Sequence, residues 1–251
     1  MRAATGTAAR LREFARQPTT LALLVFLPPI AIEVYGIALE SFPDLPALGT
    51  DPATAGRITG TLFAVAFLAG LIGLFQVIGA RNGDERLALC GFPRSTLLLT
   101  RIVTLLIVAG VGAVVAFSVF AWRVDVAAPV LAFGVLAAAG LLYGLIGVLV
   151  GTLIPRELEG SLVLVFMADL DNVLSSGLFD LGAVAEFAPL YHPHELFTAA
   201  VLEGELAAGH LVPMAAYVAV LLVAAFVAYT DRVGWNCLPR RPHALVRSIR
   251  K

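Results

Sequence analysis

The chain has 251 residues, of which 59% are hydrophobic and 14% are charged, with a formal net charge of −1 at pH 7. Soluble domains are about half apolar and about a quarter charged, so this composition excludes an ordinary soluble protein. The apolar residues form runs of roughly 20 residues, the length that a helix needs to cross a bilayer. Because lipid offers no partner for free backbone groups and no alternating barrel pattern occurs, the sequence predicts an all-α, polytopic integral membrane protein.

Residues 1–19 are predicted to form a cytoplasmic amphipathic helix along the inner membrane surface. In TGTAARLREFARQ, apolar residues such as Leu11 and Phe14 recur at helical spacing with arginines on the other face, a pattern typical of an interfacial helix. A solvated basic leader is the alternative. The apolar run that follows is long and contains two prolines and Glu33, so a retained first span is expected and not a cleavable signal peptide.

Six transmembrane helices are predicted within a transmembrane domain of residues 20–229. The fifth is the least apolar, because FMADLDNVLSSGLFD puts polar groups inside it. The stretch between the fifth and sixth spans is too apolar for an ordinary loop and too interrupted to cross. Short outer re-entrant helices, buried against protein, are therefore expected there. The predicted spans are Thr20–Leu39, Ile58–Ala80, Ile102–Trp122, Ala127–Leu153, Gly160–Leu178 and Leu211–Tyr229.

The placement of arginine predicts the orientation of the chain, since cytoplasmic flanks collect Lys and Arg. All of the 17 basic residues except Arg57 and Arg123 fall before the first span, in the 80–101 loop, at Arg156 or in a basic cytoplasmic tail, residues 230–251. Because the number of predicted spans is even, both termini are expected in the cytoplasm. The expected location is the cell (plasma) membrane, with multiple passes.

Three acidic residues and one asparagine fall within predicted spans, where ionisable groups are costly and usually face a cavity or the bundle interior. Counted from the cytoplasmic end at about 1.5 Å per residue, Glu33 lies roughly 20 Å and Asp169 roughly 14 Å into its span. No Lys or Arg falls within a predicted span to pair with them, so a protonated, hydrated or cation-binding state is expected. Either these residues line a transport path, or the 169–172 segment caps a broken fifth helix. The candidate path residues are Glu33, Asp169, Asp171 and Asn172.

The fourth span contains GLLYGLIGVLVG, in which glycines recur at steps of four, three and four. This spacing places them on one helix face, where small residues let another helix approach closely. Gly140, Gly144, Gly147 and Gly151 are therefore predicted to form a packing face, either within one subunit or across a dimer.

Nucleotide and metal chemistry have little support in the sequence. A P-loop needs a lysine after a glycine-rich turn, and the only lysine is Lys251, the last residue, so no ATP site is expected on this chain. Neither an H-E-x-x-H zinc pair nor a G-x-S-x-G elbow occurs. YHPHEL offers His192, His194 and Glu195, but its proline favours an extended dipeptide in a polar turn that caps an external helix. No metal site is predicted.

The stretch ARNGDERLALCGFPRSTLLLTR, residues 80–101, interrupts the apolar runs with charge. It opens with an Asn-Gly turn signal. Asp84 can then cap a short helix, ERLALC, which Gly91 and Pro93 end. Such a helix at the membrane surface is well placed to touch a soluble partner, although most polar loops merely connect spans.

This pattern resembles the permease subunits of ABC-2-type transporters over nearly the whole chain. RLREFARQPTTLALLVFLPPIAIEVYGIAL matches their basic amphipathic helix leading into a first span. LYHPHELFTAAVLEG corresponds to a proline-containing segment before their last span. A glycine that usually follows the acidic pair of the family's first cytoplasmic loop is missing here. The residues that match in that loop, ERLALCGFPRSTLLLTR, are Glu85, Pro93, Ser95 and Arg101.

The resemblance implies a membrane-spanning permease subunit that forms a substrate path for export, is not itself an enzyme, and pairs with a second copy or a similar permease. It further implies a separate ABC ATPase subunit that binds ATP and magnesium, while this chain contacts membrane lipid and binds no cofactor and no nucleic acid. The ATPase-coupling residues would be Asp84, Glu85, Arg86, Leu87, Pro93, Arg94 and Ser95, and the outer gate would be Tyr191, His192, His194 and Glu195.

Two other functions remain open from the residues alone. A stand-alone ion-coupled secondary transporter could use the carboxylates within the spans, although no inverted repeat of the kind that often marks such carriers is evident. An intramembrane enzyme could use Asp169 with Asp171, or the His192/His194 pair. The two aspartates point to different helix faces, however, and a paired mechanism needs carboxyls that share a proton.

Overall fold

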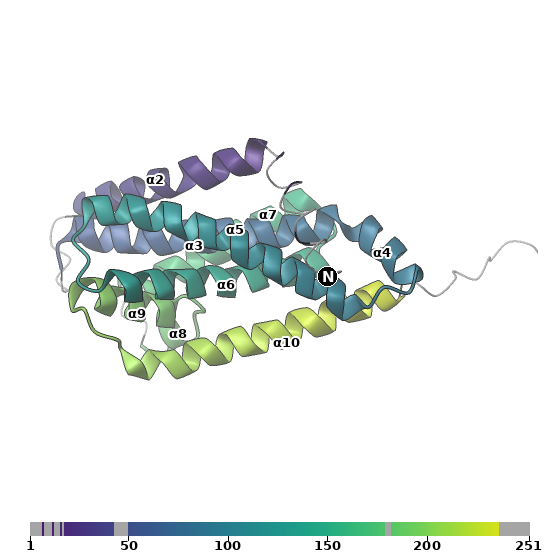
Figure 1. The fold of residues 1–251 in the computed structure, drawn as a ribbon. Coiled ribbons are helices and arrows are strands. Elements are labelled where there is room, and N and C mark those ends of the chain that lie inside the picture. Colours follow the sequence, from purple (N-terminus) through teal and green to yellow (C-terminus); the bar gives the residue numbers. More distant parts are fainter. Residues whose placement is uncertain are drawn as a thin grey trace, which may run out of the picture.

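The computed structural model describes residues 18–42, 50–178 and 182–235, together with residues 7, 12 and 16. Every regular element in these ranges is a helix, which confirms the predicted all-α class for the described part of the chain (Figure 1). The amphipathic helix predicted for residues 1–19 and most of the basic tail lie outside the described residues.

Five described helices are long and apolar enough to cross a membrane, which supports a membrane-embedded, multi-pass protein. Four other helices and one 3-10 turn accompany them. The five long helices are α2 (Pro18–Glu40), α3 (Pro52–Gly79), α5 (Arg94–Arg123), α6 (Pro129–Leu153) and α10 (Leu211–Trp235). The other elements are α4 (Arg81–Leu89), α7 (Glu157–Ser175), α8 (Ala183–Glu186), α9 (Tyr191–Leu202) and η2 (Ala208–His210).

α7 occupies the place of the predicted fifth span but differs from the five apolar helices. It has 19 residues, a length of about 28 Å at 1.5 Å per residue, close to the hydrocarbon thickness of roughly 30 Å. Its acidic residues set it apart in composition, so a sixth span remains a prediction. These residues are Glu157, Glu159, Asp169 and Asp171.

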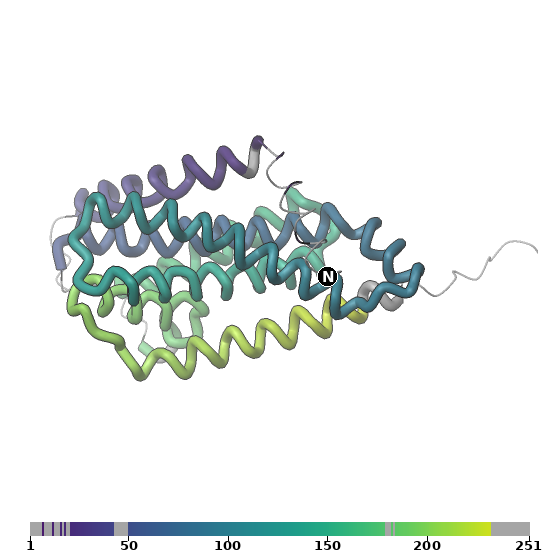
Figure 2. Tube along the Cα trace, in the orientation of Figure 1, coloured from purple at the N-terminus to yellow at the C-terminus, as the bar shows by residue number. Residues whose placement is uncertain are grey.

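The long helices run side by side, and the connections between them fall at two opposite ends of the bundle (Figures 1 and 2). α4 lies at the end where α2 begins and α10 finishes. The α5–α6 connection and α9 lie at the other end. We refer to these as the α4 end and the α9 end.

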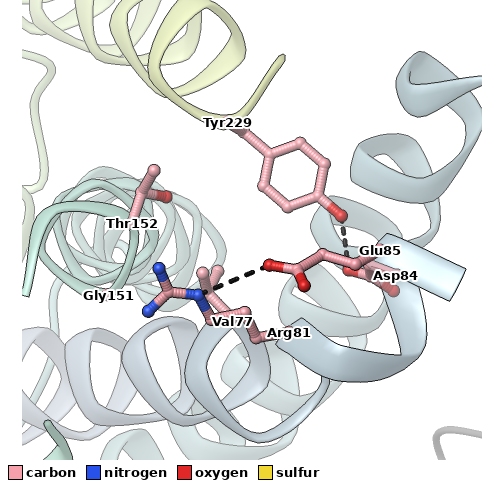
Figure 3. A pocket seen from close by; sticks show the side chains of 7 residues that line it. All are labelled: Val77, Arg81, Asp84, Glu85, Gly151, Thr152 and Tyr229. Atoms are coloured by element: carbon pink, nitrogen blue, oxygen red, sulfur yellow. Dashed lines mark hydrogen bonds and ion pairs between the residues drawn. The ribbon is translucent and has the colours of Figure 1, made fainter. Parts of the chain in front are cut away.

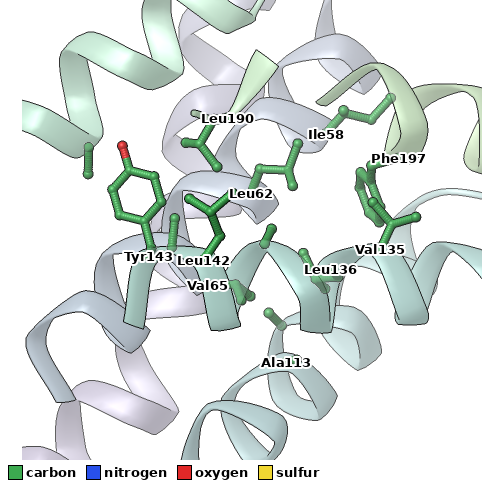
Figure 4. Packing of buried hydrophobic residues seen from close by; sticks show 14 of the residues in the cluster. Ile58, Leu62, Val65, Ala113, Val135, Leu136, Leu142, Tyr143, Leu190 and Phe197 are labelled. Atoms are coloured by element: carbon green, nitrogen blue, oxygen red, sulfur yellow. The ribbon is translucent and has the colours of Figure 1, made fainter. Parts of the chain in front are cut away.

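The core lies around α3 and α6, which pack closely along much of their length (Figure 4). In each, 67% of the most apolar stretch is buried, against 6% for α10, so α10 lies at the periphery. Large apolar side chains also cover the outside of the bundle, for example Phe26, Val111 and Val223. An apolar exterior of this extent is unstable in water and belongs in lipid.

The glycine face of α6 packs inside the subunit. A Cβ on Gly147 would overlap the carbonyl oxygen of Gly70 on α3, so only glycine allows this approach. Of the two alternatives that the sequence leaves open, the structure places this face against α3 and α5 of the same chain. The contacts are Gly140 with Val65, Gly144 with Leu105, Gly147 with Gly70 and Gly151 with Leu74.

Candidate functional site

α4 follows α3 almost directly and is the main element of the connection to α5. It begins at Arg81 with Ala80 as its N-cap residue, so the expectation that Asp84 caps this helix is wrong. The Asn-Gly pair continues the helix and makes no turn, which places Asp84 inside it, with its side chain toward the bundle. The helix ends as expected: Gly91 has φ of +82°, a conformation that glycine adopts without steric cost.

The Asp84 carboxylate lies in a closed polar cluster where α4, α5 and α10 meet. Asp84 is 1% exposed and Arg101 is 0% exposed. Arg101 Nε donates to Asp84 Oδ2 at 2.9 Å, and the Tyr229 hydroxyl donates to the same oxygen. The Arg101 guanidinium also donates to the carbonyl of Gln76 on α3. A buried charge without its partner is strongly destabilising, so this cluster fixes α4 against three other helices.

A small cavity lies beside this cluster (Figure 3). Its volume is about 30 Å³, which is far below the size of an organic-substrate pocket. Figure 3 shows the Tyr229 ring reaching down to Asp84, and the Arg81 and Glu85 side chains facing each other, with 3.8 Å between Nε and Oε1. The inner side of α4 is therefore an anchored surface and offers no room for a substrate.

The last turn of α4 presents two apolar side chains to the exterior, on different faces of the helix. Leu87 is 42% exposed and Leu89 is 67% exposed, and Arg86 beside them is also exposed. An amphipathic surface on a helix too short to span a membrane is suited to contact with another protein.

The remaining residues assigned to coupling lie where the chain enters α5. Pro93 and Ser95 are exposed, whereas Arg94 is half-buried and donates to the carbonyl of Thr230 at 3.4 Å. α10 is thus held to the α4 end through Tyr229, which contacts Asp84 and Arg101, and through Thr230, which contacts Arg94.

Glu33 has basic partners, contrary to the expectation from the sequence. Arg123 Nε lies 2.7 Å from Glu33 Oε1, and an Arg57 terminal nitrogen lies 3.8 Å from Oε2. The expectation was wrong because α5 extends as far as Arg123 and α3 begins before Arg57, so both arginines belong to helices that pack on α2. Glu33 is therefore an ion-paired residue near the α9 end.

Asp169 and Asp171 lie on α7 but have different surroundings. Asp169 is exposed and accepts a hydrogen bond from the Tyr35 hydroxyl at 2.8 Å. Asp171 is buried and accepts hydrogen bonds from the Tyr143 hydroxyl and from the backbone N–H of Leu190, the latter at 3.1 Å to each oxygen. The two carboxylates have separate partners and do not form a proton-sharing pair.

The alternative that residues 169–172 cap a broken fifth helix is wrong, because α7 continues unbroken to Ser175. Asp171 instead accepts from Leu190, the N-cap residue of α9, and so ties α7 to the start of that helix. Asn172 is fully buried, and neither of its side-chain polar atoms makes a hydrogen bond of ordinary geometry with a described residue.

The predicted gate residues form the first turn and a half of α9. Pro193 lies in the first turn of the helix, where its missing N–H costs no intrahelical bond, so the expected extended dipeptide in a turn is wrong. Tyr191 and Glu195 are half-buried. His192 Nδ1 lies 3.1 Å from the Nδ1 of His210 in η2, a partner that the sequence analysis missed.

His194 points into the protein. Its Nε2 lies 3.4 Å from the hydroxyl of Thr59 on α3, and burial lowers the pKa of His194 to about 4. The pKa of His192 is also lowered, by burial and then by the neighbouring His210. Both histidines are thus neutral near pH 7. Within the described ranges, no group of three or more His, Cys, Asp or Glu side chains is placed to hold a metal ion.

No family model matches this chain, and no curated protein matches it in a sequence search. The assignment of a function therefore rests on the geometry above, on the positions of charge along the chain, and on the motifs that the sequence carries.

Proposed function

We propose that this chain is the membrane-spanning permease subunit of an ABC transporter of the ABC-2 type, which forms a substrate path and is driven by a separate ATPase subunit. One observation carries the proposal: α4 is a short helix that is anchored through Asp84 by a buried ion pair, while its last turn exposes the apolar side chains of Leu87 and Leu89. When a protein bound to such a helix moves, the helix moves with it and displaces the helices to which it is anchored.

The contacts that anchor α4 also connect it to two of the long helices. Asp84 on α4 bonds to Arg101 on α5 and to Tyr229 on α10, so a displacement of α4 moves both long helices. In this account Asp84 is a positioning residue, and the ATPase contacts Leu87, Leu89 and the residues that surround them. These surrounding residues are Glu85 and Arg86 on α4 and Pro93, Arg94 and Ser95 at the start of α5.

The finer topology belongs to the same proposal. α7 is the sixth span, α8 and α9 are outer re-entrant helices, and α9 is the gate. Because basic residues concentrate around α4 and in the tail, the α4 end and both termini face the cytoplasm of a cell whose plasma membrane holds the protein. The exposed apolar sides of the bundle contact lipid and a second permease subunit, identical or similar, while ATP and magnesium bind to the ATPase.

Co-purification tests this proposal. A tagged chain extracted from its native membranes in mild detergent is expected to bring down an ABC ATPase, identified by mass spectrometry. Leu87→Arg combined with Leu89→Arg is expected to reduce the bound ATPase by about tenfold or more, since it places charge in an apolar contact. Leu158→Arg is the control, because Leu158 is also exposed but lies on α7. Absence of an ATPase, or its full retention by the double variant, would contradict the proposal.

A stand-alone ion-coupled carrier is the second candidate, and Asp171 favours it. Asp171 is a buried carboxylate that pairs with no basic side chain in the described part of the chain, the usual setting of a proton-relay group. The ion pair of Glu33 with Arg123 removes one of the three carboxylates that first suggested this function. Proteoliposomes loaded with a pH dye and given a pH gradient separate the candidates. Proton uptake that Asp171→Asn abolishes supports the carrier, and uptake no faster than in empty liposomes supports the permease.

A further inference from the structure

A groove runs along α2 and includes Tyr35, whose hydroxyl donates a hydrogen bond to Asp169. It has a volume of about 470 Å³, and its walls are almost entirely apolar. A hydrocarbon chain that is already in lipid gains little from burial against such walls, so the groove alone does not select a ligand. Its lining includes Phe26, Ile30, Val34 and Tyr35 of α2 and Phe63 of α3.

Aromatic rings continue from the groove to the carboxylate. The Tyr35 and Phe63 ring centroids lie 5.4 Å apart, and Phe63 stacks on Phe67 at 5.7 Å. The Tyr35 hydroxyl, at the end of this row, donates to Asp169 at 2.8 Å. The faces of aromatic rings attract cations, so the row and the carboxylate favour the same sign of charge.

Asp169 lacks the counter-ion that Glu33 has. Glu33, two residues before Tyr35, is neutralised by Arg123 and Arg57. No arginine, lysine or histidine within residues 18–42, 50–178 and 182–235 forms an ion pair with Asp169, which remains exposed. An ionisable group at membrane depth is costly without a partner, so a cationic ligand would be bound there with little competition.

Asn172 provides a second indication of a ligand at this place. It lies one helical turn beyond Asp169, and its amide is next to the Tyr35 hydroxyl. The side chain is completely buried, and although it interacts with the Tyr35 hydroxyl, neither amide atom makes a hydrogen bond of ordinary geometry with a described residue. A buried amide is destabilising unless hydrogen-bond partners satisfy it.

We propose that this groove binds an amphipathic organic cation, an alkylamine or a quaternary alkylammonium, with its charged group at Asp169 and its alkyl chain along Phe26, Ile30 and Val34. The inference rests on the proposed function, for which it names the substrate class. It excludes anionic amphiphiles, which the Asp169 carboxylate repels.

The test is equilibrium binding of tritiated dodecyltrimethylammonium to the full-length chain in lipid nanodiscs, with no ATPase present. Saturable binding is expected, displaced by unlabelled dodecyltrimethylammonium but not by dodecanoate or dodecanol, which have the same chain length. Asp169→Asn retains an acceptor for Tyr35 and is expected to weaken binding by about tenfold or more. Asp125→Asn is the matched control, since Asp125 is exposed and lies outside the groove.

Two further variants keep the proposal testable if Asp169→Asn does not fold. Phe63→Leu keeps the apolar wall but removes a ring, and a loss of about threefold is expected. Tyr35→Phe keeps the ring and leaves the carboxylate to the ligand, so affinity stays within about threefold of the wild type. Wild-type affinity in Asp169→Asn, equal competition by dodecanoate, or no saturable binding would overturn the proposal.

The outcome is separable from the test of the permease. Cation binding by a chain that never retains an ATPase would keep the groove and contradict the proposed function. If an ATPase co-purifies with the chain but the chain does not bind the cation, the proposed function is supported and the groove proposal is contradicted.

Discussion

At the α4 end, the Asp84 carboxylate is buried against Arg101 and Tyr229, whereas toward the α9 end the carboxylates of α7 have hydroxyl and backbone donors only. The first arrangement is closed: its charges neutralise each other and hold three helices together. The second leaves negative charge that the described protein does not compensate. The comparison separates a carboxylate that positions a helix from carboxylates that can meet a proton or a ligand.

Breaking the closed cluster is expected to have the largest effect. Arg101→Met leaves the Asp84 charge buried and unpaired, which should lower the free energy of unfolding by about 3–5 kcal/mol. Chemical unfolding of the detergent-solubilised protein measures the loss. The double variant Asp84→Leu with Arg101→Met should recover most of it, because no buried charge is left. Arg156→Met, which breaks the exposed pair with Glu159, should change little. If Arg101→Met and Arg156→Met lowered the free energy of unfolding equally, the closed cluster would be refuted.

The surroundings of Asp171 depend on the close packing of α6 against α3, because α6 carries Tyr143, which donates a hydrogen bond to Asp171. Gly147→Ala would drive a Cβ into the Gly70 carbonyl, and because backbone cannot move aside easily, a loss of about 3 kcal/mol is expected. Gly134→Ala in the same helix meets no atom within 4 Å and serves as the control. Thermal unfolding followed by circular dichroism compares the two. Equal stability of both variants would show that α6 tolerates a wider spacing.

The two α7 aspartates should themselves differ. Asp171→Ala leaves the Tyr143 hydroxyl and the Leu190 N–H without their acceptor, and a loss of about 2 kcal/mol is expected. Asp169→Ala removes one exposed hydrogen bond and should cost well under that. Unfolding in detergent gives both values. A larger loss for Asp169 than for Asp171 would reverse the assignment of ligand and structural roles.

The effect that is smallest at neutral pH concerns His194 at the α9 end. His194 stays neutral in the folded protein down to about pH 4, while in the unfolded chain it takes up a proton below about pH 6.5. The unfolded state binds more protons in this window, so stability falls as the pH is lowered from about 6.5 to about 4. In His194→Gln, the free energy of unfolding should change less with pH between about 6.5 and about 4. Above pH 7, where His194 is neutral in both states, the substitution should act only through packing. Unfolding midpoints at several pH values measure the slope, and identical slopes in both proteins would count against a buried neutral histidine.

Much of the helical architecture follows from the sequence because lipid permits few alternatives. The apolar runs located the five long helices, and Gly91 with Pro93 marked the end of α4. Composition does not decide whether α7 crosses the membrane, since this helix has the length of a span but carries four acidic residues.

The polar contacts were less predictable because they join distant parts of the chain. Arg101 lies 17 residues after Asp84, and Tyr229 lies 145 residues after it. An arginine inside the first turns of an apolar helix is the one signal that could have pointed to a buried acidic partner. The pairing of Glu33 with Arg123 was missed for a different reason: the span was ended one residue too early, which placed the arginine in a loop.

The most direct test of the central claim, that a separate ATPase docks on α4, uses Cys90, which is exposed immediately after that helix. In a Cys237→Ser background, Cys90 is labelled in native membranes with a maleimide–benzophenone reagent and irradiated. We expect an adduct that contains an ABC ATPase and that disappears in the Leu87→Arg/Leu89→Arg variant. Adducts without any ATPase, or labelling of Cys90 by an impermeant maleimide from outside intact cells, would contradict the account.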